Sequence, residues 1–596
     1  NFKKHFLSVI LIILVFAGLA SKIDRGLNIA FNSDHVQQAV YFWDIIENNN
    51  YFLSGWQLPI NPYLFTEFPF YFVLGLLFGM NLITIKISAI LIFITGIFLS
   101  SFILYKTYGG KAALFNAAFL TGSSLVYSYF FLQPYIHIGT INFSLISLLI
   151  IISIIKGNTG AAGGKRRNFN NKAIYYILLF IVPALSVFSD VYYIFIFIIP
   201  VIFSLTALNF INMQLVSKGK IIIQILLLIA GTAVGLILQH AVSIFGLNII
   251  RHIPAGLASF QKIKQNLYLY IQCVSELFNL DFLKSDTSGV NFIALSNLFI
   301  FILVIISALV VFKREKNPLK KFVMFYLINV WIFLSAAFIF SSTPNAIDHL
   351  RYLSPLTYVL AFFLSILICG NYNVINRKLK IFIIMLFLVS SVHNIYKDFQ
   401  FKSDQPNLQL LKFLELNNLH YGYSSYWHSN IITVLSQNKV KVRPVEYINN
   451  RIKPFPVLIK SDWYKLTAYF GPTFLIVPKR SGDAEFGLLE LKQERIKKLF
   501  GKPQMILPFE NMDIYIWPYN IMEVVNKNRA MSVDITEKTP HQIGVMESLP
   551  DGNIMHASKG QSGFLVFGPY WTLKEGRYRV KFKLMQMEMQ IRRLLR

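Results

Sequence analysis

The sequence predicts a mostly α-helical membrane protein with a smaller α/β domain toward its C-terminal end. Hydrophobic residues make up 55% of the 596 residues and charged residues only 14%, and the mean hydropathy is +0.52. Soluble domains carry about 25% charged residues. This composition excludes an ordinary soluble protein and is typical of a chain that crosses a bilayer many times.

Eleven apolar runs are long enough to cross a bilayer, which takes about 20 residues in an α-helix. The first run has no small-residue cleavage site before Lys22 and is followed by further runs, so we expect a retained helix rather than a signal peptide. Together the runs predict a transmembrane domain over residues 1–396. They lie at 5–21, 83–105, 112–129, 138–155, 173–189, 191–211, 221–246, 291–312, 322–341, 355–370 and 379–396.

Lysine and arginine are distributed unevenly over the loops between these runs. With the N-terminus inside, the inner loops hold 19 Lys and Arg residues against one acidic residue, and the outer loops hold 8 against 10 acidic residues. Because positively charged loops stay in the cytoplasm, we predict a multi-pass protein of the cell inner membrane with a cytoplasmic N-terminus and an extracytoplasmic, periplasmic C-terminal domain. The net charge of +27 then reflects topology, and we expect the lipid bilayer rather than nucleic acid as partner.

Few residues outside the outer loops carry candidate chemistry. The predicted topology puts Cys273 outside and Cys369 near the inner end of its helix, so the two cysteines are not expected to form a disulfide. P-loop, GxGxxG, HExxH and CxxC patterns do not occur in a context that would give them meaning. The acidic residues of the outer loops are therefore the candidates.

The sequence pattern changes after residue 396. Helices are predicted in QPNLQLLKFLELNN and LLELKQERIKKLFG, and strands in KVKVRPVEYI and PTFLIVPK. These elements predict an extracytoplasmic α/β domain over 397–530. A partial β-rich tail is expected over 531–596, where GFLVFGPYWTLKEGRYRVKFKL resembles the opening of a carbohydrate-binding β-sandwich. Two strands alone are marginal, so we expect a truncated module from about residue 545.

Asp34 is the first candidate in the long first outer loop, 22–82. It follows the first helix in the stretch FNSDHVQQAVYFWDII, whose apolar spacing suits a short interfacial helix. A carboxylate at this place can act as a general base or bind a cation. The alternative is helix capping, because Asn32, Ser33 or Asp34 could begin the helix, and Gln37 has the spacing of a capping-box partner.

The order of these parts resembles the C-type glycosyltransferase superfamily (GT-C) of multispanning enzymes, which includes protein O-mannosyltransferases and bacterial aminoarabinose transferases of lipid A. The features that carry the resemblance are the acid after the first helix, the proline- and aromatic-rich segment GWQLPINPYLFTEFPFYFVLGLLFG, the further spans and the soluble outer domain. The signature acid of the family falls on Asp34. Many members have two adjacent acids, whereas the neighbour here is His35, so the resemblance leaves open whether a divalent cation, Mg²⁺ or Mn²⁺, binds Asp34.

Two further stretches fit the same family. AIDHLRYLSPLTYVL places Arg351 and Tyr352 before a proline at the outer start of a helix, as in many bacterial members, and YGYSSYWHSNIITVLSQNKVKVRPV looks like the outer domain of uncharacterised bacterial glycosyltransferases. The resemblance implies a membrane-bound inverting glycosyltransferase, with a polyprenyl-phosphate-linked sugar as donor and a glycan, lipid or protein as acceptor.

In that reaction Asp34 would be the catalytic base. Arg351, with Tyr352 beside it, would bind the donor phosphate, because a guanidinium group matches phosphate oxygens bidentately. The alternative for Arg351 is an interfacial anchor.

Asp190 lies between two apolar runs with almost no loop, and acids at membrane depth usually face a cavity or a partner. We expect His137, which opens the fourth helix on the same side, as its partner, with helix capping as the alternative for Asp190. Weaker candidates for lining the site are His35, Asp44, Glu67 and His349. Candidates for stacking on the acceptor, with core packing as the alternative, are Tyr426, Trp427 and His428.

Two functions from other classes also agree with a many-spanning chain. The first is a transporter or flippase of lipid-linked saccharides, although transporters usually show paired repeats or broken helices in matching halves. The second is a non-catalytic envelope assembly protein that uses its outer domain for binding. Transfer of the sugar from the donor to any acceptor would distinguish the enzyme from both.

The distribution of positive charge generates a topology prediction. A tag placed after Lys397 should react with a membrane-impermeant reagent added outside intact cells, because eleven spans carry the chain out. A tag in the loop 157–172 should be protected, because that loop is rich in Lys and Arg. Reversed labelling of the two tags would contradict the placement of every candidate residue.

Overall fold

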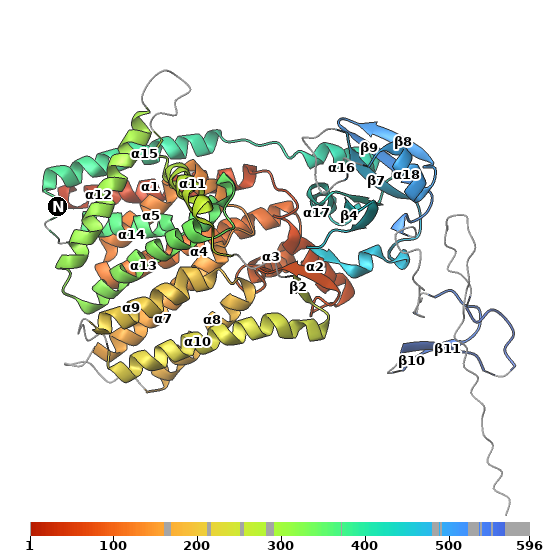
Figure 1. Cartoon of the computed structure of the whole chain (residues 1–596), viewed down its shortest axis with the longest axis horizontal. Coiled ribbons are helices and arrows are strands. Elements are labelled where there is room, and N and C mark those ends of the chain that lie inside the picture. Colours follow the sequence, from red (N-terminus) through yellow and green to blue (C-terminus); the bar gives the residue numbers. More distant parts are fainter. Residues whose placement is uncertain are drawn as a thin grey trace, which may run out of the picture.

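The computed structural model shows a helical bundle with a smaller α/β domain at one end (Figure 1). The described residues are 2–159, 169–210, 216–250, 256–281, 291–370, 372, 374–479, 488, 491–522, 536, 539–549, 552–558 and 560–566. The helices of the bundle and its outer loops are α1 (Phe2–Asn28), α2 (Gln37–Asn48), α3 (Phe68–Phe78), α4 (Leu82–Tyr108), α5 (Gly110–Thr121), α6 (Leu125–Phe131), α7 (Ile138–Thr159), α8 (Phe169–Ser189), η1 (Ile194–Ile198), α9 (Ile199–Phe210), α10 (Lys218–Ala241), η2 (Val242–Phe245), α11 (Phe260–Phe278), α12 (Phe292–Arg314), α13 (Pro318–Phe340), η3 (Ile347–Leu353), α14 (Leu356–Cys369) and α15 (Arg377–Gln400).

Each of the eleven predicted apolar runs falls on helix. Within the described residues, seven helices are long and apolar enough to cross a membrane, and the pair η3 and α14, bent by 52°, makes an eighth span if it is counted as one. The other runs correspond to the shorter apolar helices α8, α9 with η1, and α5 followed by α6. The prediction of a mostly helical, multi-pass membrane protein is confirmed.

Asparagine side chains define where several of the long helices begin. Asn81, Asn291, Asn317 and Asn376 accept hydrogen bonds from backbone N–H groups in the first turns of α4, α12, α13 and α15. These bonds satisfy N–H groups that would otherwise lack a partner. Pro318 at the start of α13 has no N–H group to satisfy.

The α/β domain, which we call the outer domain after the side of the membrane that the sequence predicts for it, is built on a sheet of six described strands in the order β5-β4-β3-β7-β9-β8. β3 runs parallel to β4 and β7, and the remaining pairs are antiparallel. The four predicted stretches of helix and strand contain α16, α18, β4 and β7. The elements of the domain are α16 (Asn407–Leu416), β3 (Tyr421–Ser424), α17 (Tyr426–Leu435), β4 (Lys441–Ile448), β5 (Arg451–Pro454), β6 (Ile459–Lys460), η4 (Ser461–Tyr464), η5 (Leu466–Ala468), β7 (Thr473–Pro478), α18 (Gln493–Phe500), β8 (Met505–Phe509) and β9 (Met512–Trp517).

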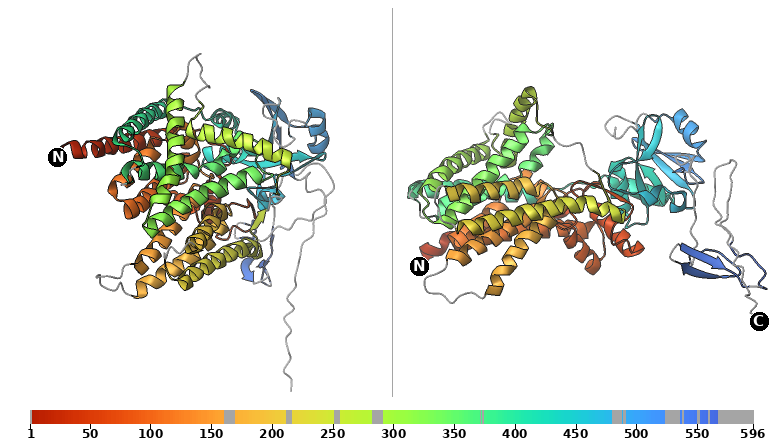
Figure 2. Two further views of the ribbon diagram at one scale, coloured as in Figure 1. Left: turned by 60° about the vertical axis from the view of Figure 1, so that its left-hand side comes forward. Right: turned by 60° about the horizontal axis from the view of Figure 1, so that its bottom comes forward.

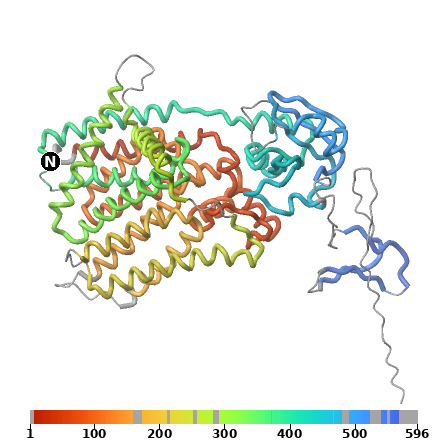
Figure 3. The backbone as a smooth tube through the Cα atoms, in the orientation of Figure 1, coloured from red at the N-terminus to blue at the C-terminus, as the bar shows by residue number. Residues whose placement is uncertain are grey.

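A second, small sheet joins the outer domain to the bundle. β1 (Trp56–Pro59), in the first outer loop, pairs in parallel with β2 (Asn248–Ile250), which follows α10. The same strand pairs antiparallel with β6 of the outer domain. Both views in Figure 2 place the outer domain at this end of the bundle, and Figure 3 shows the chain passing into it from α15.

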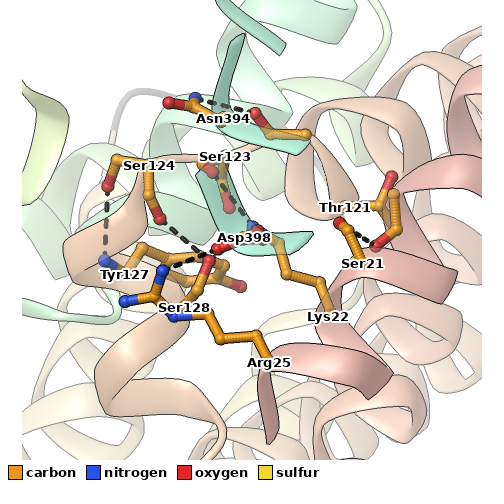
Figure 4. Close-up of polar contacts among 12 residues, drawn as sticks. Ser21, Lys22, Arg25, Thr121, Ser123, Ser124, Tyr127, Ser128, Asn394 and Asp398 are labelled. Atoms are coloured by element: carbon orange, nitrogen blue, oxygen red, sulfur yellow. Dashed lines mark hydrogen bonds and ion pairs between the residues drawn. The ribbon is translucent and has the colours of Figure 1, made fainter. Parts of the chain in front are cut away.

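A buried ion cluster fastens the ends of α1 and α15 together (Figure 4). The Asp398 carboxylate accepts hydrogen bonds from Lys22 Nζ at 2.6 Å and from Arg25 Nη1 at 2.8 Å, and all three side chains are buried. Lys22 also donates to the Ser123 carbonyl and to Ser128 Oγ. The prediction that Lys22 and Arg25 lie in the outer loop is wrong, because α1 extends to Asn28 and Asp398 neutralises part of their charge inside the protein.

The tail after the outer domain contains β10 (Val545–Leu549) and β11 (Gly552–His556), which form an antiparallel hairpin. The segment on which the β-sandwich expectation rests lies largely outside the described residues, which end at 566. The truncated module therefore remains an expectation.

The ion cluster predicts a large stability effect. Asp398→Ala should lower the free energy of unfolding by about 3–5 kcal/mol, because it leaves two buried cations unpaired. Asp404→Ala removes an exposed carboxylate three residues before the start of α16 and should change stability by less than about 0.5 kcal/mol. Thermal unfolding of the two variants in the same detergent checks this, and equal transition temperatures would contradict it.

Candidate functional site

Asp34 lies in the turn between α1 and α2, but it does not cap α2. The helix starts after Val36, and no side chain caps its first turn. The Asn32 side chain accepts the Asp34 N–H group at 3.0 Å, and Ser33 Oγ accepts the N–H group of Ile431 in the outer domain at 3.3 Å. The capping alternative for Asp34 is therefore wrong, and its carboxylate is available for another purpose.

The carboxylate of Asp34 is held by the outer domain. Tyr426, at the start of α17, donates its hydroxyl to Asp34 Oδ1. The Tyr426 ring is buried, with Phe455 stacked at 4.8 Å and Trp427 at 5.1 Å between ring centroids. Burial raises the pKa of Asp34, while the Tyr426 hydrogen bond and the positive charge of Arg351 lower it. Asp34 keeps part of its surface exposed.

Arg351 and Tyr352 lie on η3, directly before the bend into α14. The guanidinium carbon of Arg351 lies 5.2 Å from the centre of the Tyr352 ring, and Nη2 donates to the Tyr352 hydroxyl at 3.4 Å. Within the described residues, the buried Arg351 Nε has no hydrogen-bond partner. The charge of Arg351 acts on Asp34, so a base and a cation with unused hydrogen-bonding capacity lie in the same region.

The expected contact between His137 and Asp190 is present. His137 Nδ1 lies 2.7 Å from Asp190 Oδ2, and both side chains are buried. Thr140 donates to the same carboxylate oxygen at 2.5 Å, and the Tyr63 hydroxyl lies 2.9 Å from His137 Nδ1. This network joins the start of α7 to the end of α8.

Aromatic side chains connect this network to η3. The Tyr192 hydroxyl donates to the Tyr352 carbonyl. The His137 ring lies 4.5 Å from the Tyr192 ring and 5.5 Å from the Tyr352 ring, and His349 lies 5.7 Å from Tyr352. The predicted candidates His137, Asp190, His349, Arg351 and Tyr352 thus lie in one connected region.

Glu67 holds the backbone at the start of α7. Its buried carboxylate accepts the N–H groups of Tyr135 and Gly139, each at 3.2 Å. Burial raises the pKa of Glu67 to about 7, although these backbone hydrogen bonds oppose the increase. A Cβ atom on Gly139 would lie 2.3 Å from the Thr66 carbonyl oxygen, so this close approach needs glycine.

Sequence reasoning missed three tyrosines of the site, Tyr63, Tyr135 and Tyr192. Tyr63 and Tyr135 pack edge to face at 4.8 Å, and both adopt left-handed backbone angles, with φ of 52° and 70°. Such angles are uncommon for bulky residues and often mark functional segments. Each of the two follows a proline, in INPYLF and LQPYIH. This repeated Pro-Tyr pair is the sequence signal that could have identified them.

Asp44 has a different set of partners. Its carboxylate accepts hydrogen bonds from Asn48, Asn50, Trp56 and Lys460 at 2.7–2.8 Å. Burial raises the pKa of Asp44, but the hydrogen bonds from these four side chains outweigh it and lower the pKa below its usual value. Lys460 belongs to β6, so Asp44 fastens the outer domain to the first outer loop instead of lining the region around Asp34.

The remaining candidates have structural partners. His35 Nδ1 accepts the Asn32 N–H group at 3.1 Å, and burial lowers the pKa of His35 to about 4. His428 Nδ1 lies 2.8 Å from Asn407 Oδ1, while Trp427 is partly exposed. Among the residues that the structure describes, no group of three or more His, Cys, Asp and Glu side chains could hold a metal ion.

No family model matches the chain, and no curated protein matches it. Among solved structures, the chain is similar to ArnT from Cupriavidus metallidurans bound to undecaprenyl phosphate, at 8% identity and a TM-score of 0.49 over 86% of this chain and 98% of that one. It is also similar to the oligosaccharyltransferase of Archaeoglobus fulgidus in complex with zinc and sulfate, at 11% identity and a TM-score of 0.45 over 85% and 72%. At these identities and scores, the roles of individual residues rest on the geometry of this chain.

Proposed function

We propose that the chain is an inverting glycosyltransferase that moves a sugar from a polyprenyl-phosphate donor to a hydroxyl group of an envelope glycan, lipid or protein at the outer face of the membrane. The proposal is carried by two groups in the same region: Asp34, which is partly exposed and does not cap α2, and Arg351, whose charge acts on Asp34 and whose Nε has no hydrogen-bond partner among the described residues. Both lie at the end of the bundle where the outer domain docks.

The reaction needs a base and a positive charge at these places. The acceptor oxygen attacks the anomeric carbon of the donor sugar, and Asp34 takes the proton of the acceptor hydroxyl. The bond between the anomeric carbon and the phosphate oxygen breaks, and the phosphate leaves with the electron pair. Arg351 stabilises the phosphate through charge-assisted hydrogen bonds. Attack from the face opposite the phosphate inverts the anomeric configuration.

The surrounding residues support these two groups. Tyr426 fixes one carboxylate oxygen of Asp34 and favours the ionised form, which is the form that accepts a proton. Tyr192 holds the backbone of η3 through the Tyr352 carbonyl, and the His137–Asp190 pair packs behind it. The groups are thus held before the substrate arrives, which lowers the cost of ordering them.

The residues around Asp34 do not fit a divalent-cation site. The neighbouring His35 uses Nδ1 to accept a backbone N–H group, and the described residues form no cluster of three or more metal-binding side chains here. A cation such as Mg²⁺ or Mn²⁺ would need several oxygen ligands. The steps above therefore use only side chains of this chain.

Asp34→Asn tests the base. The amide keeps the size of the side chain and an oxygen for the Tyr426 hydrogen bond but cannot accept the proton, so transfer from a radiolabelled polyprenyl-phosphate sugar should fall by about 10²–10⁴-fold. The matched control is Asp348→Asn, which changes an exposed acid on η3 and should leave transfer unchanged. In the wild-type protein, transfer should decline as the pH falls through the raised pKa of Asp34, because protonation removes the base. Normal transfer by a correctly inserted Asp34→Asn protein would refute the assignment.

Arg351→Lys tests the phosphate site. Lysine keeps the positive charge but loses the planar group that holds two phosphate oxygens. The KM for the donor should therefore rise at least tenfold, which corresponds to a loss of about 1.4 kcal/mol or more of binding free energy. The KM for the acceptor should change little. An unchanged donor KM would return Arg351 to the role of an interfacial anchor.

A further inference from the structure

Helix α11 lies across the direction of the membrane-spanning helices. In Figure 1 it is seen nearly end-on, whereas α10, α13 and α15 run across the picture. Asn266 of α11 donates to the carbonyl groups of Ile339 and Ser341 at 3.0 and 2.7 Å, and the Tyr270 hydroxyl lies 2.8 Å from Ser335 Oγ. These contacts fasten α11 to the last turns of α13.

The contacts also define the depth of α11. α13 ends at Phe340, where the chain leaves the span. Ser335 lies five residues before that end, which corresponds to about 7.5 Å along the helix axis at 1.5 Å per residue. α11 therefore lies within about 7.5 Å of the end of α13 along its axis.

The surface of α11 divides into three faces. One face is buried against the protein and includes Asn266, Cys273 and Leu277. The second face is apolar yet exposed, and its members with their exposed fractions are Phe260 (74%), Leu267 (47%), Tyr268 (66%) and Ile271 (58%). The third face is exposed and polar, and its members are Gln261, Gln265 and Gln272. At 100° per residue the second and third faces lie side by side.

We propose that α11 is an interfacial helix that binds the lipids of the outer leaflet. The second face lies among the upper lipid chains, and the glutamine face points to water. A water-exposed helix would leave four large apolar side chains unburied, and a spanning helix would bury three glutamines without partners. Lys264 lies within the arc of the apolar face, and its ammonium group is 5.0 Å from the centre of the Phe260 ring. Its long side chain can lie along the apolar face while the charged end reaches the negative phosphate groups of lipids.

The inference also bears on the candidate functional site, and this second part of it rests on the proposed function. Cys273 Sγ donates to the Ile347 carbonyl of η3 at 3.8 Å, and η3 carries Arg351. A helix that rests on the lipid surface therefore supports the segment with the guanidinium. Arg351 is thereby held at the depth at which a lipid-linked phosphate is found.

Spin labels test the placement of α11 in the full-length protein. Ile271→Cys and Gln265→Cys lie on the apolar and glutamine faces of the same helix, and each is labelled in a Cys369→Ala background, since Cys273 is buried. The proteins are placed in nanodiscs of phosphatidylethanolamine and phosphatidylglycerol. The Ile271→Cys label should be relaxed by oxygen and protected from a water-soluble nickel complex, and the Gln265→Cys label should show the opposite.

Two outcomes would overturn the inference. Access of the nickel complex to both labels would show that α11 stands in water. Protection of the Ile271→Cys label with spin–spin broadening between molecules would show that a second copy of the chain covers the face.

A second measurement separates this inference from the proposed function. Ile271→Glu should weaken the retention of undecaprenyl phosphate at least tenfold, and Gln265→Glu, the matched control, should not. If the label depths are as expected but Asp34→Asn leaves transfer intact, α11 remains an interfacial helix and the proposed function fails. If both labels are in water, the inference about α11 fails whatever the enzyme does.

Discussion

The pairing of Asp44 with Lys460 is the constraint on which the arrangement of the site depends. Both groups are buried, and each would be costly without the other. Because Asp44 belongs to the first outer loop and Lys460 to the outer domain, satisfying these charges places β6 beside β1. The same docking brings Tyr426 to Asp34 across 392 positions of sequence. The proposed base therefore owes its geometry to a domain that the chain reaches only after its last span.

This arrangement gives the acids of the first outer loop three separate roles. Glu67 binds backbone N–H groups at the start of α7, and Asp44 binds the outer domain. Asp34 alone of these three combines an exposed part with a neighbouring cation. Carboxylates close to a bilayer usually have a partner. Asp44 and Glu67 are held by several hydrogen bonds, whereas Asp34 has fewer, and this difference separates the proposed reactive acid from the two structural ones.

Local sequence patterns predicted the parts of the fold that depend on local physics. Hydrophobic runs located the helices, because a segment that lies in lipid must be apolar over its whole length. Alternation of apolar and polar residues located β4, and a short continuous apolar run located β7. The end of α1 was misplaced because Lys22 and Arg25 look like loop residues until their partner Asp398, more than 370 positions away, is known. The contact of His137 with Asp190 could be predicted because two adjacent apolar runs left the acid no other place. The Tyr426–Asp34 and Lys460–Asp44 contacts could not, because no periodicity connects distant segments.

The measurement that tests the central claim most directly uses a polyprenyl-phosphate-linked sugar labelled in its sugar. The purified chain in proteoliposomes is incubated with this donor and with an envelope extract as acceptor, and the label is followed into acceptor and into released polyprenyl phosphate. The account predicts transfer with release of one polyprenyl phosphate for each sugar moved, abolished by Asp34→Asn. Movement of intact labelled donor across the bilayer without release of polyprenyl phosphate would contradict it and would indicate a transporter.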